Sequence, residues 1–226
     1  MNFFIRTNIS KEIGIGHLVR VMRLGDKLKK LGHKCWFFID HVPKSNLKIF
    51  KLNKLYSIYS EKSNFFSEIE DSKIFNLKTS QIGMGFVIVD DYRLSYVWEK
   101  AVAKKHLKIM AFDDLENKKH YVDFILNYNP RHHENNLYNK KNVLKKSCML
   151  LINPRYNIIN PTFKKGIGYL KSNNFEILFY IGGAGDLSYF YKIIINLLNI
   201  TKKLKKKVII KIVIGPLSKN KNLIFK

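Results

Sequence analysis

Continuously apolar runs alternate with amphipathic stretches from Phe3 to Ile152. The runs predict strands at residues 3–5, 35–39, 56–59, 86–89, 108–112, 124–126 and 149–152. Between them, His17 to Leu31 has apolar residues at helical spacing and is followed by Gly32, which predicts where the helix stops. A polar helix after residue 59 and a helix at 96–105 complete the alternation. Strands of this kind belong to a parallel sheet covered by helices on both faces, so we predict an α/β fold.

The pattern restarts after a polar stretch with two glycines, residues 163–174, which we interpret as a linker. A strand at 177–181, a glycine-rich turn, a helix at 189–204 and a strand at 208–214 follow. We therefore expect two Rossmann-like lobes, 1–165 and 175–226. Because a lobe of this kind needs about 150 residues, we expect the second lobe to be only partly present, as a truncation or a fragment.

The chain has 41 Lys and Arg against 17 Asp and Glu, a net charge of +24. Such a charge is compatible with a nucleic-acid or membrane-surface protein, or with lysine placed wherever a solvated face permits. The lysines are spread along the whole chain and Arg-rich stripes with exposed aromatics are missing, which favours the second interpretation and no nucleic-acid partner. A basic surface would still attract an anionic ligand.

The two cysteines, Cys35 and Cys148, have neither a metal-binding spacing nor a CxxC arrangement, and we interpret both as reduced core thiols. The segment before Lys11 carries one charge and enters a strand directly, which does not resemble a signal peptide. No apolar run is long enough for a membrane span. We expect a cytoplasmic protein without a membrane span, and a monomer.

The first candidate for chemistry is Gly14-Ile15-Gly16-His17, between the first strand and its helix. Glycines at such a turn let backbone N–H groups approach a ligand, and the helix N-terminus favours negative charge. His17 could exchange a proton near neutral pH. The same residues could equally form a plain turn, and the third glycine of a dinucleotide-binding fingerprint is missing.

Polar groups also follow three other predicted strands. Asp90-Asp91-Tyr92 and Asp113-Asp114 end neighbouring strands, so they could meet at the sheet edge where α/β proteins bind ligands, or simply be solvated strand ends. Gly182 to Asp186 could hold a diphosphate or form a tight turn. Paired carboxylates can bind a metal, but no third ligand has suitable spacing and His132-His133 fits a solvated loop, so we expect no metal.

Taken in order, these pieces resemble the UDP-2,4-diacetamido-2,4,6-trideoxy-β-L-altropyranose hydrolases of pseudaminic acid biosynthesis. This family is also described as flagellin-modification or spore-coat polysaccharide proteins. The resemblance covers almost the whole chain, and its specificity lies in the ordered set. The matching pieces are Arg6, Ile13-Gly14-Ile15-Gly16-His17-Leu18-Val19-Arg20, Asp90-Asp91-Tyr92, Phe112-Asp113-Asp114, Asp123-Phe124-Ile125-Leu126-Asn127 and Gly182-Gly183.

The resemblance implies a two-lobed fold of the GT-B glycosyltransferase type and hydrolysis of a UDP-sugar without a cofactor. It implies that His17 is the general base for a water that attacks the anomeric carbon with inversion, and that Tyr92 helps to hold the water or sugar. The remaining residues that it assigns to substrate binding are Arg6, Gly14, Gly16, Arg20, Asp90, Asp113, Gly182 and Gly183.

Three departures from the family pattern bear on this expectation. Ala184-Gly185 separates the Gly pair from Asp186, which puts a phosphate role for Asp186 in doubt, and Asn160 replaces an Arg. The family's late Ser-rich loop for uridine and diphosphate would lie beyond Lys226, so we expect weak nucleotide binding. A glycosyltransferase of the same fold and a non-catalytic, basic sugar-nucleotide-binding protein remain alternatives.

Overall fold

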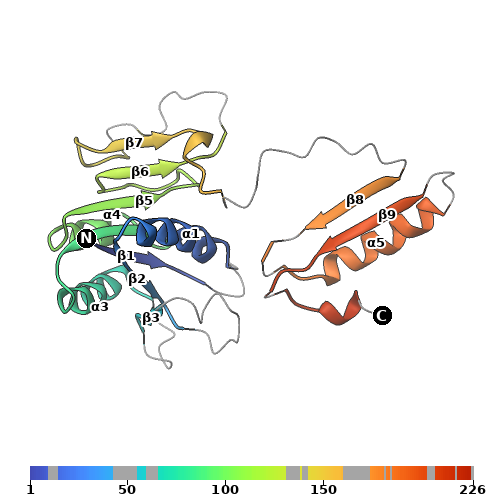
Figure 1. Cartoon of the computed structure of the whole chain (residues 1–226), viewed down its shortest axis with the longest axis horizontal. Coiled ribbons are helices and arrows are strands. Elements are labelled where there is room, and N and C mark those ends of the chain that lie inside the picture. The colour runs from blue at the N-terminus through green and yellow to red at the C-terminus, as the bar shows by residue number, and fades with distance from the viewer. Residues whose placement is uncertain are drawn as a thin grey trace. The chain divides into compact units, whose positions relative to one another are not determined.

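The fold was analysed in a computed structural model, which describes residues 1–9, 15–42, 55–59, 66–130, 138, 142–159, 174–180, 182–183, 185–202, 207–216 and 218–224. The chain forms two compact units. The first comprises Met1–Asn8 and His17–Ile159, and the second comprises Ile9–Gly16 and Asn160–Lys226. Each unit is built around its own parallel sheet (Figure 1).

The first unit contains a seven-stranded sheet in which every neighbouring pair of strands is parallel. Its strands are β1 (Asn2–Thr7), β2 (Lys34–Ile39), β3 (Leu55–Ser57), β4 (Gly85–Asp90), β5 (Lys108–Phe112), β6 (Phe124–Asn127) and β7 (Met149–Ile152). They lie in the order β3-β2-β1-β4-β5-β6-β7. This is a Rossmann-like order, since the chain builds outward on one side of β1 and then returns to build on the other.

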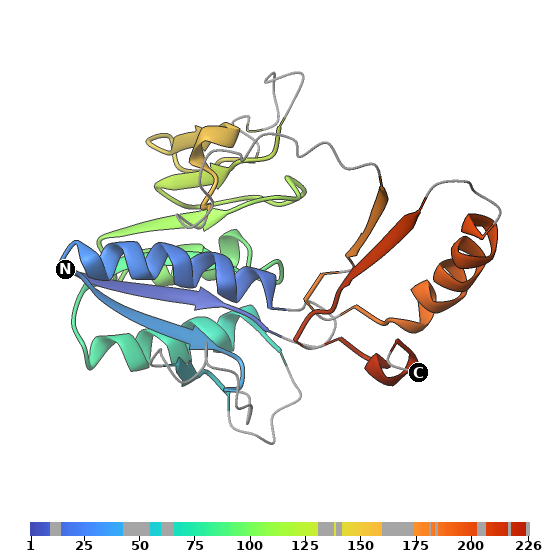
Figure 2. The same ribbon diagram turned by 45° about the vertical axis from the view of Figure 1, so that its right-hand side comes forward.

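Helices cover both faces of this sheet (Figures 1 and 2). Phe37 and Phe38 are neighbours on β2 and therefore point to opposite faces. Phe37 packs towards helix α1 (Gly16–Lys30), close to Gly25. The Phe38 ring lies 5.1 Å from that of Phe75 on helix α3 (Glu68–Ser80), and α3 packs beside helix α4 (Tyr96–Ala103). Both faces are thus buried, which explains why the strands read as continuous apolar runs.

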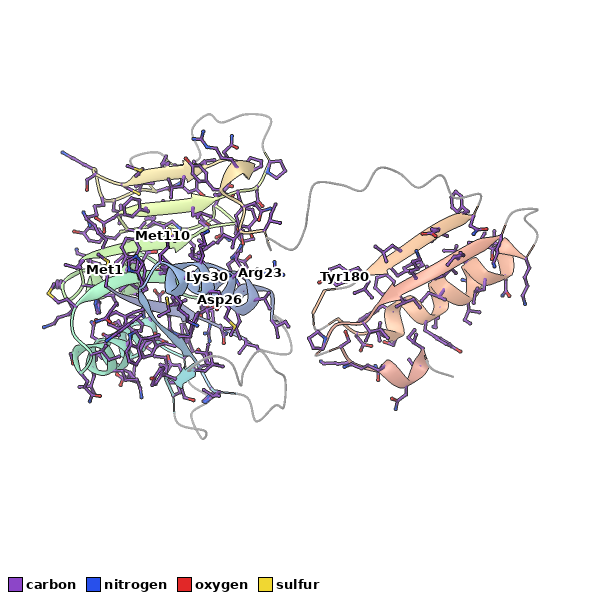
Figure 3. The ribbon with its side chains drawn as sticks, viewed as in Figure 1. Met1, Arg23, Asp26, Lys30, Met110 and Tyr180 are labelled. Carbon is purple, nitrogen blue, oxygen red and sulfur yellow. The ribbon has the colours of Figure 1, made fainter. Side chains whose placement is uncertain are left out.

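Helix α1 shows the amphipathic pattern that its sequence predicts. Its buried residues recur on one side and are Leu18, Val21, Met22 and Gly25. The outer side carries charged residues, including the exposed Arg23, Asp26 and Lys30 (Figure 3). Burial of this apolar stripe on the sheet orients the first turn of the helix, and with it His17.

The second unit contains strands β8 (Phe175–Tyr180) and β9 (Val208–Val213), which pair in parallel. Helix α5 (Ser188–Thr201) connects them and packs on the sheet, with the ring of Phe190 5.8 Å from that of Phe179. Gly182 has a φ of 81°, which favours glycine in the turn after β8. Two short 3-10 helices, η1 (Pro154–Tyr156) and η2 (Lys221–Leu223), complete the secondary structure of the described residues.

The predicted α/β class and its parallel, helix-covered sheet are confirmed. Each predicted strand is present among the described residues, with ends that agree or differ by at most two residues. Two helices end earlier than predicted, α4 at Ala103 and α5 at Thr201. In the part of the chain that the structure describes, no helix is long and apolar enough to cross a membrane.

Candidate functional site

The candidate site lies in the first unit, where the carboxyl ends of β1 and β4 meet. These two strands are neighbours, with Thr7 beside Asp90 in the register. The strand order reverses at this point, and open α/β sheets bind their ligands at such a position. His17 in the first turn of α1 and Asp90 at the end of β4 come together here.

His17 and Asp90 are in close polar contact, with 2.6 Å between Nδ1 and Oδ1. Asp90 also accepts two hydrogen bonds from Arg20, so both of its oxygens act as acceptors. A contact this short then requires a proton on His17 Nδ1, and we assign that tautomer. Among the described residues no group hydrogen-bonds Nε2, which therefore keeps its lone pair in the neutral imidazole. In this tautomer Nε2 is the ring nitrogen that could accept a proton.

Arg20 lies one turn after His17 on the same side of α1. Its guanidinium donates from Nε and Nη2 to Asp90, and from Nη1 to Asp114 (2.7 Å) and the Tyr128 hydroxyl (2.6 Å). Burial opposes the charge of Arg20, but Asp90 and Asp114 outweigh it and raise the pKa of the guanidinium. Since these donors are used within the protein, Arg20 connects α1 to the ends of three strands rather than presenting a free charge.

Tyr92 supplies the aromatic wall of the site. Its ring is edge-on to the His17 imidazole, with 4.4 Å between centroids and 89° between planes. The hydroxyl donates to Asp114 Oδ2 at 3.0 Å. Burial and the negative charge of Asp114 raise the pKa of Tyr92, so the phenol stays protonated. The side chain is still partly open to solvent, at 36% exposure, and can contact a ligand.

A second cluster of charges lies in the same unit and contains Arg6. Arg6 is fully buried and donates to Asp71 (2.7 Å from Nη2) and to Asp40. Arg93 bridges Asp40 and Asp91 with four further hydrogen bonds to their carboxylates. The predicted contact between Arg6 and a substrate therefore finds no support in its placement, because the guanidinium is enclosed by protein carboxylates.

Asp113 is also buried behind the site rather than open to it, with 1% exposure. Its carboxylate accepts from Tyr138 and lies 3.3 Å from His120 Nε2, whose other ring nitrogen contacts Glu99 at 2.7 Å. Burial acts to raise the pKa of Asp113, but hydrogen bonding and charge from His120 outweigh it and lower that pKa. The placement of Asp113 is that of a buried ion-pair partner.

The other predicted site residues are distributed as follows. Gly16 is the first residue of α1, directly before His17, and Gly14 lies outside the described residues. Gly182 and Gly183 belong to the second unit, in the turn after β8. The His132-His133 pair also lies outside the described residues. Within the described ranges, no three His, Cys, Asp or Glu side chains are arranged to hold a metal ion.

Several residues of the site and of the neighbouring Arg6 cluster were not predicted from the sequence. Tyr128 follows the end of β6 and Asp40 follows β2, so the strand-end rule that singles out Asp90 could have found both. Lys118 and Arg93 lie in loops without a motif. Asp71 is inside α3, where a carboxylate normally indicates a solvated helix face.

A comparison with protein-family models and with curated proteins finds no match to this chain. The fold and the geometry above define the class: a Rossmann-like α/β protein with a histidine–aspartate pair at the switch point of its sheet.

Proposed function

We propose that this protein hydrolyses a UDP-linked diacetamido-trideoxy sugar to UDP and free sugar, a step of pseudaminic acid biosynthesis that serves cell-surface and flagellin glycosylation. The observation that carries the proposal is the 2.6 Å contact between His17 Nδ1 and Asp90. It orients the imidazole and leaves Nε2 as the base that hydrolysis requires. The ordered motifs around His17, Tyr92 and Asp113 supply the substrate class by resemblance.

In the proposed reaction, His17 Nε2 takes a proton from water as the water oxygen bonds to the anomeric carbon. The bond from that carbon to the β-phosphate oxygen breaks, and UDP leaves with the electron pair. UDP is a good leaving group, so the protein mainly needs a placed base and stabilised phosphate charge. Attack opposite to the leaving group inverts the anomeric configuration. Tyr92, edge-on to His17, is placed to contact the water or the sugar.

In the same proposal the two units correspond to a GT-B organisation. The first unit is the catalytic lobe, and the second corresponds to the nucleotide-binding lobe, with Gly182-Gly183 at its first turn. Gly16, the first residue of α1, contributes its backbone N–H group to substrate binding. The substrate is a nucleotide sugar of the cytoplasm, where we place the protein.

The experiment is hydrolysis in H₂¹⁸O, with the purified chain and millimolar UDP-sugar. We expect release of UDP without ¹⁸O and of a sugar that carries ¹⁸O at its anomeric carbon, with the inverted anomer appearing first in NMR spectra. Label in UDP would mean attack at phosphorus and would contradict the proposal.

The alternatives give different results in the same assay. UDP release that requires an added sugar acceptor would identify a glycosyltransferase. Nucleic-acid binding that weakens steeply with salt, without UDP release, would identify a basic binding protein and reject the hydrolase.

A further inference from the structure

The loop between β4 and α4 determines where the Tyr92 ring lies. Tyr92 is the second residue of this loop, and within the described residues its side chain forms one hydrogen bond, from the hydroxyl to Asp114. The ring nevertheless keeps its edge-on contact with His17, although the side chain is 36% exposed. A partly exposed side chain with one hydrogen bond depends on its backbone for orientation, so the groups that hold the loop backbone matter for the site.

Lys118 contacts that backbone from the connection between β5 and β6. Its ammonium lies 2.8 Å from the carbonyl oxygen of Tyr92, 2.9 Å from that of Leu94 and 3.4 Å from that of Asp91. An ammonium has three N–H donors, and here all three are directed at carbonyls of one loop. In the described part of the chain Lys118 forms no ion pair. Its contacts therefore serve the loop rather than a carboxylate.

Arg93 holds the other side of the same loop, but in a different way. It donates to Asp91 and Asp40 within the buried charge cluster of Arg6. Removing Arg93 would leave buried carboxylates with too few donors, which is costly for folding. Removing the ammonium of Lys118 leaves no buried charge behind. It only takes one hydrogen-bond donor away from each of three backbone carbonyl oxygens. Lys118 can thus be changed with less damage to the fold, and its effect on Tyr92 can be measured.

We propose that Lys118 is a positioning residue, which holds the Tyr92 loop by its carbonyls so that the Tyr92 ring lies against the His17 imidazole. Lys118 itself does not touch the reacting atoms. The structural part of this proposal stands on the contacts of Lys118 alone, and its effect on catalysis rests on the proposed function. The two parts are therefore measured separately.

The structural part is tested by NMR of the His17 ring C–H groups in protein with ¹³C-labelled histidine, assigned with His17→Gln. An aromatic ring 4.4 Å away shifts these resonances through its ring current. Tyr92→Leu gives the resonance position without the ring. We expect Lys118→Met to move the His17 resonances towards that position and Lys118→Arg to retain most of the wild-type shift. Lys119→Met, at the exposed neighbouring lysine, is the matched control and should leave them unchanged.

Unchanged His17 resonances in folded Lys118→Met would overturn the proposal, whatever the activity. If Lys118→Met does not fold, Lys118→Gln decides in the same way, because its shorter polar head cannot reach all three carbonyls.

The catalytic part is measured as UDP release. We expect Lys118→Met to lower kcat by roughly 10- to 100-fold, as displaced catalytic geometry does, with KM changed less than kcat. If Lys118→Met shows shifted His17 resonances but has the same kcat as Lys119→Met, the effect of Lys118 on catalysis is rejected. Absence of UDP release by the wild type would reject the proposed function and leave the NMR result to decide the placement of Tyr92.

Discussion

At the scale of single residues, His17, Asp90 and Arg20 have different relations to a ligand. Among the described residues, His17 Nε2 has no hydrogen-bond partner, whereas both oxygens of Asp90 and the donors of Arg20 are used within the protein. Arg20 is also stacked on Phe112, 4.6 Å from the ring centroid. In the proposed reaction His17 is therefore the group that meets the substrate, and Asp90 and Arg20 act through its orientation.

His120 is a second histidine whose charge matters, although it is buried. Burial acts to lower its pKa, but hydrogen bonds and charge from Asp113 and Glu99 outweigh burial and raise that pKa to about 9, from an ordinary value of 6.5. The imidazolium is thus the ion-pair partner of two buried carboxylates, one following β5 and one on α4. Neutralising it would leave both without their cation.

We predict that His120 makes the free energy of unfolding fall as the pH rises from 6.5 to about 9. A pKa raised on folding contributes stability that is fully present below pH 6.5 and lost as the pH rises through about 9. The contribution is on the order of 3 kcal/mol. Urea unfolding of wild type and His120→Gln between pH 6 and 10 measures it. The wild type should be more stable at pH 6.5, and the two unfolding free energies should converge above pH 9; a constant difference over this range would count against the ion pair.

At the scale of elements, α1 approaches β2 unusually closely because residue 25 is glycine. A Cβ at Gly25 would lie 2.6 Å from Cζ of Phe37. Helix α1 carries His17 and Arg20, so its distance from the sheet sets the position of the candidate site.

We predict that Gly25→Ala destabilises the first unit by about 1 kcal/mol or more. Alanine in a helix interior normally gains up to ~1 kcal/mol over glycine, but overpacking against Phe37 costs about 1–3 kcal/mol. The measurement is the free energy of unfolding in urea. In a Phe37→Leu background, which removes the contacting ring atom, the same change should cost less. An increase in stability in the wild-type background would show that the contact does not limit the approach of α1.

The succession of strands and helices in the first unit was predictable from the sequence, because its central strands β1, β4, β5 and β6 are buried on both faces and α1 is strongly amphipathic. Helix α3 could be predicted from the sequence only as a polar helix after residue 59, without its bounds. Its buried residues include Asp71, Ser72 and Thr79, so its inward side does not differ from its outward side in polarity. Asp71 and Thr79 are buried because they meet Arg6, Trp98 and His106 from other elements, which no local pattern can indicate.

At the scale of the whole molecule, the site depends on the order of strands in the sheet. The sequence predicted that polar strand ends gather at one edge, and His17 and Asp90 do meet there. It could not predict that β1 and β4 are neighbours, nor that Arg6 would be enclosed by carboxylates from β2 and α3, since both follow from long-range packing.

The central claim is that His17 is the base of the reaction, and the most direct measurement is the rate of UDP release by His17→Gln. Glutamine keeps a polar side chain but removes the basic nitrogen. We predict that kcat falls by roughly 10²- to 10⁴-fold, the usual contribution of a general base. The matched control is His33→Gln, the same change directly before β2, at the opposite end of the strands, and it should retain the wild-type rate. Equal rates of UDP release by His17→Gln and His33→Gln would contradict the account.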